Sequence, residues 1–298
     1  MNAPLTGPDL DRLFAALRPK LHRYCARMTG SVIDGEDVVQ AALMKALEAL
    51  PHAGSIAYPE AWLFRIAHNA ALDFIRVRAR KEQLFSDIDP ESVDDPVDPI
   101  EDRQDVALSL HRLMQLPATQ RSAVVLMDVL GYSLQEIAPI MESTIPAVKA
   151  ALHRGRGMLR RLADTPEDAP VPALAAPQRA LLVRYVDRFN ARDFDAIRDL
   201  LADEVQLDLV ARSRLAGRKD VSGYFTNYEK IPGWRLVAGT VEGRPAALVH
   251  LSDGSSDEAA GRPAYVVLPQ WADGRLVQIR DFYFARYAVE DAIMVSAD

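Results

Sequence analysis

The sequence predicts a multidomain protein in which two all-helical domains precede an α+β domain. Three observations support this fold class. Apolar residues recur with helical spacing through 1–85 and again through 106–162, whereas strand-like runs begin only after residue 201. Two acidic, proline-containing stretches, 86–105 and 164–177, separate these parts. A chain of 298 residues is long enough for two or three such domains.

Composition excludes several classes of protein. With 49% hydrophobic and 26% charged residues, the chain resembles soluble globular proteins rather than disordered ones. We expect no membrane span, because no apolar run approaches about 18–20 residues, and no secretory signal in residues 1–11. The single cysteine, Cys25, excludes a disulfide framework and a cysteine-cluster zinc site. We therefore expect a cytoplasmic protein without metal or cofactor.

The net charge of −7 is unevenly distributed along the chain. Residues 86–105 carry nine Asp and Glu against Arg103 alone, a net charge of −8. The flanking blocks are mildly basic, +2 for 1–85 and +4 for 106–162, and the remainder is acidic at −5. Because electrostatic fields act locally, the two basic blocks can face nucleic acid despite the acidic total.

The first block predicts three helices. The first follows apolar residues spaced three and four apart from Leu10 to Met28. The second has Asp34 as its expected N-cap, and the third opens with Pro59 in its first turn. One face of the third helix combines Trp62, Arg65, Asn69, Arg76 and Arg80. Such a mixture suits single-stranded DNA, although a lone tryptophan is more often a core residue.

The clearest motif lies in residues 116–162. Gly131 and Tyr132 form a turn, and Ser133 with Glu136 has the spacing of a capping box. A second helix follows with Pro146 in its first turn, so the segment predicts a helix-turn-helix whose second helix can enter the major groove. That helix carries a basic stripe beside an apolar one, formed respectively by Lys149, His153, Arg156 and Arg160, and by Val148, Leu152, Gly155, Leu159 and Leu162. The alternative is a solvated basic face on an ordinary helical hairpin.

Together these segments resemble the bacterial extracytoplasmic-function sigma factors over about residues 8–163. Similarity to regions 2.2 to 2.4 of that family lies in residues 35–40 (Gly-Glu-Asp-Val-Val-Gln) and 61–69 (Ala-Trp-Leu-Phe-Arg-Ile-Ala-His-Asn). Similarity to region 4 lies in residues 116–121, 131–138 and 147–156. Each motif alone is modest, but all of them in the family's order, with an acidic linker between the two blocks, are highly specific.

The resemblance implies a subunit that binds core RNA polymerase and directs it to promoter DNA. By similarity, the polymerase contacts are Glu36, Asp37 and Gln40, and Asp37 and Gln40 share an exposed stripe with Met44 and Glu48. The −10 contacts are Trp62, Arg65, Asn69 and Arg76, beside the loop 51–58. The −35 contacts are Lys149, His153, Arg154 and Arg156. Two residues depart from the family pattern, Pro139 in the first helix of the helix-turn-helix and Ala53 in the −10 loop.

The tail predicts one long helix followed by an antiparallel sheet. The amphipathic helix covers residues 180–201. The strand-like runs are 205–210, 234–241, 246–251, 264–270 and 276–284. Turns at Glu242-Gly243 and Asp273-Gly274 separate several of them.

Residues 180–288 also resemble a known family, the SnoaL-like branch of the NTF2 fold, in which a curved sheet and helices form a cone. Residues 185–195 are similar to its opening helix pair and 274–283 to its closing strand. The resemblance implies that the tail regulates the sigma domains in cis, in place of a separate anti-sigma factor. A Trp-Leu-Pro-Glu-Pro-like linker motif, found in one group of such sigma factors, is absent from 164–177.

The tail also carries residues suited to a small-molecule pocket. The predicted pocket residues are Tyr185, Asp208, Trp234, His250, Asp281 and Tyr283, with Tyr228 as a further lining candidate. Asp208, His250 and Asp281 are candidate general bases, since related cones use an Asp or His to remove a proton from carbon. The alternative is a structural histidine and a core of aromatic side chains, and we favour binding of a small apolar ligand over catalysis.

The predicted organisation follows from these observations. It comprises a polymerase- and −10-binding domain (8–85), an acidic linker (86–105), a −35-binding helix-turn-helix domain (106–163), a proline-rich linker (164–177) and a regulatory domain (178–298). We therefore expect an alternative sigma factor rather than an enzyme. One rival hypothesis is a ligand-sensing one-component helix-turn-helix regulator, which would bind an operator without polymerase. The other is an enzyme of the tail fold with helical appendages.

Overall fold

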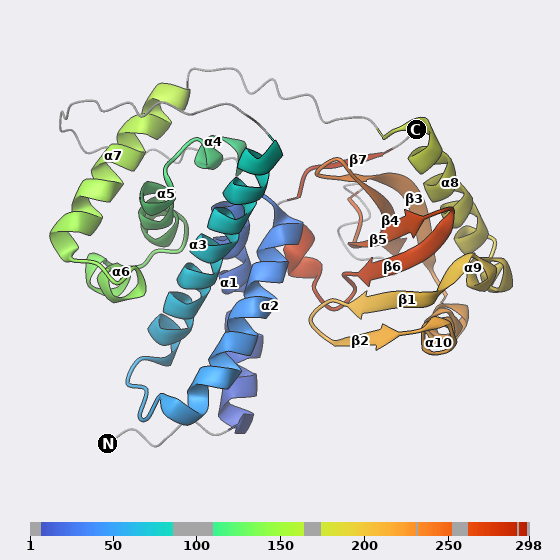
Figure 1. The fold of residues 1–298 in the computed structure, drawn as a ribbon, viewed down its shortest axis with the longest axis horizontal. Helices are drawn as coiled ribbons and strands as arrows, with labels where there is room; N and C mark the ends of the chain where they lie inside the picture. Colours follow the sequence, from blue (N-terminus) through green and yellow to red (C-terminus); the bar gives the residue numbers. More distant parts are fainter. Residues whose placement is uncertain are drawn as a thin grey trace. The chain divides into compact units, whose positions relative to one another are not determined.

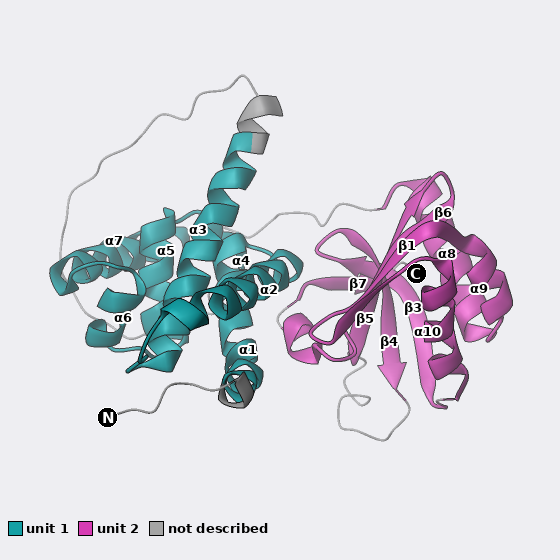
Figure 2. Cartoon of the chain, turned by 60° about the horizontal axis from the view of Figure 1, so that its bottom comes forward, with its two compact units in different colours: residues 1–168 teal, residues 169–298 magenta. Residues whose placement is uncertain are grey.

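The chain folds into two compact units, a helical unit (Met1–Asp168) and a tail unit (Ala169–Asp298), as Figure 2 shows. This is a computed structural model, and it describes residues 7–85, 110–163, 174–230, 232–251, 262–290 and 292–296. The predicted fold class, helical first and α+β after, is confirmed. The acidic linker and most of the proline-rich linker lie outside the described residues.

The first half of the helical unit consists of three helices and a short 3-10 turn (Figure 1): α1 (Gly7–Thr29), α2 (Val32–Ala49), η1 (Leu50–His52) and α3 (Pro59–Phe85). Pro59 opens α3, as the sequence predicts. The expected N-cap of α2 is wrong. Ser31 caps the helix, and its Oγ accepts a hydrogen bond from the Asp34 backbone N–H at 3.1 Å. Asp34 therefore lies in the first turn, where its charge favours the helix dipole.

The second half consists of α4 (Leu110–Met114), α5 (Ala118–Val124), a π-helical turn η2 (Val125–Val129), α6 (Leu134–Ile140) and α7 (Ile145–Ala163). The predicted capping box opens α6, with both of its hydrogen bonds present between Ser133 and Glu136. Pro139 lies inside α6, which ends one residue later. The proline lacks a backbone donor, so it shortens the helix at a position where the turn to α7 begins.

One hydrophobic core joins α1–α3 to α4–α7. The rings of Phe64 and Tyr132, one from each half, pack edge to face with centroids 5.2 Å apart. At Gly30 the two halves approach so closely that a Cβ would lie 2.6 Å from Met114 Cγ, and the backbone there has a φ of +76°. Only glycine suits that position. The helical unit is therefore a single body in this structure.

The tail begins with helices α8 (Ala176–Asn190) and α9 (Phe194–Leu200), and α10 (Arg218–Lys230) follows later in the chain. The predicted single helix over residues 180–201 is wrong. Arg192 adopts a left-handed conformation with a φ of +57°, and the Asp193 side chain accepts from the backbone N–H of Ala196 at 3.2 Å. The chain therefore stops one helix and caps the next within three residues.

A seven-stranded sheet forms the rest of the tail, in the order β2-β1-β6-β5-β4-β3-β7. Its strands are β1 (Leu201–Leu209), β2 (Ser213–Ala216), β3 (Trp234–Val241), β4 (Arg244–Leu251), β5 (Tyr265–Ala272), β6 (Arg275–Asp281) and β7 (Met294–Ser296), with a short helix η4 (Arg286–Val289) between the last two. The expected turns are confirmed, with positive φ at Glu242, Gly243, Asp273 and Gly274. The sheet is not purely antiparallel, because β1 pairs parallel to β6.

The core of the tail is rich in aromatic side chains. Helix α8 packs against β3 and β4, and α10 packs against β1. Phe189 lies at the centre, with its ring centroid 5.0 Å from that of Tyr228 and 5.1 Å from that of Trp234. Helix α10 and the two edge strands β2 and β7 were not predicted, because α10 is rich in polar residues and the strands are only four and three residues long.

Candidate nucleic-acid interface

Helix α7 buries its apolar stripe and leaves a basic face in solvent. Val148, Leu152 and Leu159 are buried, and a Cβ at Gly155 would lie 2.9 Å from Val124 Cγ2 of α5. The glycine therefore lets the recognition helix approach α5 closely. Away from the apolar stripe, Lys149 and Arg154 are exposed and His153 is half-buried. A face of this kind can contact phosphates and guanine edges.

Arg156, predicted to contact the −35 element, is held by a neighbour. Its Nε and Nη2 donate to the two carboxylate oxygens of Asp128 at 3.0 and 2.6 Å. This is the bidentate geometry of a strong charge-assisted pair. The side chain is still 44% exposed, but binding a phosphate through these two donors would require it to leave Asp128. Its main role in this structure is to brace α7 against η2.

The predicted −10 residues share a surface of α3 but differ in exposure. Arg65, Asn69 and Arg76 are exposed, and Trp62 is half-buried and packs against the core. Arg76 forms an ion pair with Asp73 at 3.3 Å. Asn69 Nδ2 donates to Glu142 Oε2 at 3.5 Å, and Glu142 belongs to the turn between α6 and α7. The side chain expected to read a −10 base therefore touches the helix-turn-helix.

A buried polar cluster beneath this surface was not predicted. The Tyr24 hydroxyl lies 2.7 Å from His68 Nδ1 and 2.9 Å from Ser122 Oγ, and all three residues are buried. Burial lowers the pKa of His68 to about 4, because the charged imidazolium would be desolvated. The signal was present in the sequence, since His68 follows the buried Phe64 by four residues on the same helical face.

A second polar group joins the two halves of the helical unit nearer the surface. Lys20 Nζ lies 2.7 Å from Glu60 Oε1 and 4.0 Å from the centroid of the Tyr132 ring, and the Tyr132 hydroxyl donates to the same Glu60 oxygen. Burial alone would raise the pKa of Glu60, but the hydrogen bonds from Lys20 and Tyr132 hold it below its usual value.

The predicted polymerase-binding face of α2 needs one correction. Glu36 is fully buried and forms an ion pair with Arg18 of α1, so it cannot present its carboxylate to a partner. Asp37 is exposed and Gln40 is half-buried. The same stripe includes the exposed apolar side chains of Met44 and Leu47, which are 56% and 51% exposed. Exposed side chains of this size mark a surface suited to protein contact.

In the tail, Asp281 is the centre of a buried hydrogen-bonded group. Its Oδ2 accepts from the hydroxyls of Tyr224 and Tyr228 at 2.6 and 2.8 Å, and its Oδ1 accepts from the Tyr283 backbone N–H at 2.8 Å. Burial raises the pKa of Asp281, and the two tyrosine hydroxyls oppose that shift. Nearby, the buried hydroxyl of Tyr185 has no hydrogen-bond partner among the described residues.

The predicted pocket residues do not converge, because successive strand residues point to opposite faces. Asp281 and Trp234 face the helices, whereas Asp208 pairs with Arg280 on the other face, at 3.4 Å. His250 follows the helix-facing Val249, so it also points away from Asp281. Tyr283 lies outside this core with 38% of its surface exposed, packed edge to face on Tyr265. The three candidate bases therefore cannot share one substrate.

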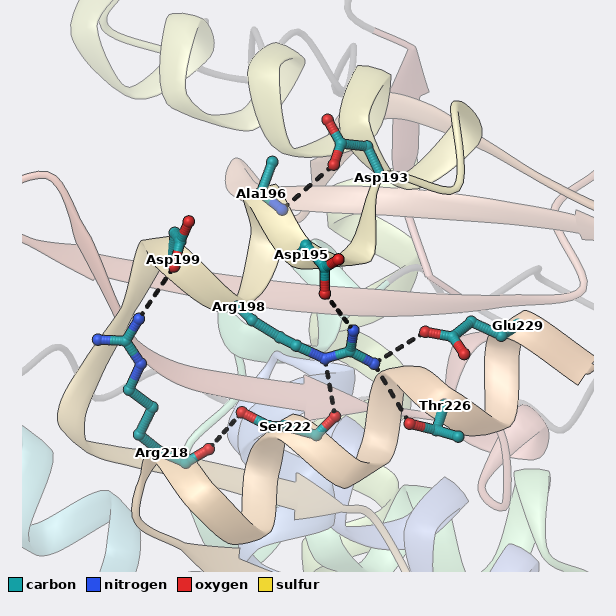
Figure 3. A network of polar contacts seen from close by, with 9 residues as sticks. All are labelled: Asp193, Asp195, Ala196, Arg198, Asp199, Arg218, Ser222, Thr226 and Glu229. Carbon is teal, nitrogen blue, oxygen red and sulfur yellow. Dashed lines mark hydrogen bonds and ion pairs between the residues drawn. The ribbon is translucent and has the colours of Figure 1, made fainter.

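A charged network fastens the tail helices to one another (Figure 3). Arg198 of α9 donates to Glu229 and Thr226 of α10, at 2.8 and 3.2 Å, and to Asp195 of its own helix at 2.8 Å. Arg218 pairs with Asp199 at 3.3 Å beside it. The network links α9 to α10 across the rim of the tail and is structural.

In the described parts of the chain, no helix has the length and hydropathy of a membrane span.

Comparison with known proteins finds family matches in two segments of the helical unit. Family models match at residues 13–81 (Sigma-70 region 2) and 110–159 (Sigma-70, region 4). The chain is 27% identical over 297 aligned residues to the ECF RNA polymerase sigma factor SigG of Mycobacterium tuberculosis, covering 84% of this chain and 78% of SigG. That span includes most of the tail. The chain is also 35% identical to the ECF RNA polymerase sigma factor SigM of the same species over 159 residues, which cover 51% of this chain and 76% of SigM.

Among solved structures, the chain is similar to an NTF-2 like protein from Burkholderia xenovorans. The identity is 23% and the TM-score is 0.28, and the likeness covers 35% of this chain and 80% of that one.

Proposed function

Because the chain belongs to the extracytoplasmic-function RNA polymerase sigma factors and directs transcription initiation as an alternative sigma factor, we propose how its parts divide that work. The family binds core RNA polymerase and promoter DNA. In this chain residues 8–85 serve the polymerase and the −10 element, 106–163 serve the −35 element, and 178–298 regulate. Its location is cytoplasmic, because both partners are there.

The proposed polymerase surface is the exposed stripe of α2. It consists of Asp37, Gln40, Met44 and Glu48, with Leu47 beside them. Two exposed apolar side chains flanked by carboxylates offer burial and charge complementarity together. Glu36 contributes indirectly, because its buried pair with Arg18 fixes α2 against α1.

The proposed promoter contacts lie on two helices. On α3, Asn69 reads the −10 base beside the loop 51–58, whose Tyr58 is 78% exposed, and Arg65 and Arg76 bind the strand's phosphates. The half-buried Trp62 supports that face. On α7, Lys149, His153 and Arg154 contact the −35 element, and Arg156 joins them only after it leaves Asp128.

The tail is proposed to control the helical unit in cis and to take a small apolar ligand rather than to catalyse a reaction. Its interior is aromatic, and the Tyr185 hydroxyl, which has no hydrogen-bond partner within the described ranges, supplies one polar contact for such a ligand. The separation of Asp208 and His250 from Asp281 supports this choice, because acid–base catalysis needs its groups around one substrate.

The observation that carries the proposal is that one chain has two separate exposed surfaces whose residue types suit DNA, the basic face of α7 and the Asn-and-Arg face of α3. Run-off transcription with purified core polymerase, on promoters selected in the same assay, tests it. Promoter-specific transcripts from the full chain or from a truncation ending at Asp164 are the expected result. The ratio between the two forms gives the sign of the tail's control. Operator binding without polymerase, and no transcripts, would favour the one-component regulator.

A further inference from the structure

The exposed cations of the recognition helix α7 stand in two rows along the helix. At about 100° per residue, Lys149 and Arg160 lie within about 20° of each other around the helix axis, and so do Arg154 and Arg161. All four side chains are exposed. The two rows are about 120° apart by the same geometry, so they border the exposed face of the helix on its two sides.

The line between the two rows points straight away from the protein core. Gly157 follows the buried Val148 by nine residues, and Ala150 precedes the buried Leu159 by nine residues. Nine residues are two and a half turns, which places both Gly157 and Ala150 on the side of the helix opposite its buried stripe. Both residues are partly exposed.

The two glycines of α7 have different surroundings. A Cβ at Gly155 would lie 2.9 Å from Val124 Cγ2, so packing explains that glycine, whereas a Cβ at Gly157 would meet nothing within 4 Å. Glycine weakens a helix relative to alanine, and no neighbour among the described residues requires it at Gly157. A molecule that approaches the helix backbone closely from outside accounts for it.

The geometry of the major groove matches this face of α7. The groove is about 12 Å wide and admits one α-helix, and the phosphates of the two strands border it. With one row of cations toward each strand, the line between the rows faces the base edges. There Ala150 presents a methyl group, and the apolar group that a base pair presents in the major groove is the C5-methyl of thymine.

We propose that α7 enters the groove with the Ala150–Gly157 line against the base edges, and that Ala150 determines specificity by contacting a thymine methyl group. Gly157 allows the close approach that this contact needs. Lys149 and Arg154 bind phosphates of opposite strands and position the helix. The inference rests on the proposed function, in which α7 reads the −35 element, and it names the group on the DNA that is read.

Run-off transcription on templates that lack this methyl group tests the contact. The full chain is combined with core polymerase and a promoter selected in the same assay, and deoxyuridine replaces the thymines of the −35 element, one strand at a time. Deoxyuridine pairs with adenine as thymine does but has no C5-methyl. At limiting polymerase, transcription should fall roughly fourfold for the strand that carries the contacted thymine, the effect of one buried methyl group.

Ala150→Gly removes the protein's methyl group from the same contact. The ratio of transcripts from thymine and deoxyuridine templates should then fall from about four to about one, as expected when the two changes remove one interaction. Ala163→Gly is the matched control, the same change at the exposed last residue of α7. It should keep the ratio unchanged.

Gly157→Ala tests the close approach and separates DNA reading from folding. The substitution should keep or raise the melting temperature of the free chain, because alanine favours a helix. Transcription should fall at least about fivefold, since the added methyl group occupies space that the DNA needs. Gly223→Ala makes the same change in α10, where a Cβ also meets nothing within 4 Å, and should leave transcription unchanged.

The outcomes separate this inference from the proposed function. Equal transcription from thymine and deoxyuridine templates would show that α7 reads no methyl group, and the inference is then wrong while the proposed function stands. It is also wrong if Ala150→Gly leaves the ratio unchanged, or if the selected −35 element consists of G·C pairs alone. If the unsubstituted chain gives no transcripts from any template, the proposed function fails instead.

Discussion

The helical unit and the tail each bury a hydrogen-bonded polar cluster, but the two clusters differ in what they join. In the helical unit, the Tyr24 hydroxyl connects His68 and Ser122, which belong to the two halves expected to read separate DNA elements. In the tail, Asp281 connects one strand to α10 through Tyr224 and Tyr228, inside a single core.

The difference indicates which buried polar groups can separate without leaving unpaired groups in a core. The cluster of the helical unit uses neutral side chains, each able to bond to water once exposed, so its separation costs little beyond the apolar burial. The tail cluster surrounds a buried carboxylate inside a single core, so the loss of its contacts leaves buried polar groups unpaired. We therefore expect the first cluster to separate more readily than the second.

The largest expected effect comes from removing the tail carboxylate. Asp281→Ala leaves the Tyr224 hydroxyl and the Tyr283 N–H without an acceptor, at roughly 1–3 kcal/mol each, whereas the Tyr228 hydroxyl keeps its contact with the Tyr265 hydroxyl at 3.0 Å. We expect the free energy of unfolding of the tail to fall by about 3–5 kcal/mol in urea denaturation, with the helical transition unchanged. Asp195→Ala, at a side chain that is 93% exposed, should change it by less than about 0.5 kcal/mol. An equally small effect of Asp281→Ala would show that the Asp281 carboxylate does not stabilise the tail.

Two neighbouring carboxylates of α2 should separate stability from polymerase binding. Glu36→Ala leaves the largely buried Arg18 without its partner, and we expect a loss of about 3 kcal/mol in the unfolding free energy of the helical unit. Asp37→Ala should change the unfolding free energy by no more than about 0.5 kcal/mol. It should weaken binding to core polymerase, measured by competition with a labelled sigma factor for the polymerase. The reverse pattern would place Glu36, not Asp37, at the polymerase.

The helical unit should lose stability in mild acid through His68. Burial lowers the pKa of this residue from an ordinary value of 6.5 to about 4. The charge of Glu142 opposes this shift, and the charge of Arg76 adds to it. Between these values the unfolded chain binds a proton that the folded chain does not, so stability falls as pH drops from 6.5 to 4, by up to about 3 kcal/mol.

Urea denaturation at pH 7, 6 and 5 measures this effect. His68→Gln should flatten the pH dependence, whereas His52→Gln, at an exposed histidine, should preserve it. A slope that survives His68→Gln would assign the acid sensitivity to another group.

The smallest expected effect compares two arginines of the recognition helix. Arg154→Ala removes an exposed cation and should lower transcription from a −35-dependent promoter roughly 10-fold, as the loss of one good base or phosphate contact does. Arg156→Ala removes a side chain already paired with Asp128, so a reduction of about threefold or less is expected. Run-off assays on one promoter measure the effects of both substitutions. Equal losses of transcription would show that Arg156 separates from Asp128 when the protein binds DNA.

Much of the fold is readable from local signals in the sequence. The capping box at Ser133, the start of α3 at Pro59 and the two hairpin turns each depend on a few adjacent residues, and they are confirmed. Ser31 was missed because two capping residues, Ser31 and Asp34, compete within one turn. Helical periodicity missed the break at Arg192, because a left-handed arginine has no sequence signature. The resemblance of residues 185–195 to a pair of helices did imply it.

The site residues show the complementary limit. Helical spacing predicts which residues share a face, and the apolar stripe of α7 is buried accordingly. It does not predict pairing with a residue far along the chain, and so the burial of Glu36 against Arg18, the capture of Arg156 by Asp128 and the Tyr24–His68–Ser122 cluster were not expected. In the tail, one-residue shifts of register decide which face a side chain occupies, so Asp208 and His250 were grouped with Asp281 although they point away from it.

Hydrogen exchange of the free chain and of the chain bound to core polymerase and promoter DNA tests the central claim most directly. The account predicts that peptides from α2 around Asp37 and Met44 and from α3 around Asn69 gain protection in the complex, because the polymerase and the −10 element cover them. Tail peptides around Asp281 and Tyr224 keep theirs. Equal protection of α2 in both states, in a complex that transcribes, would contradict it.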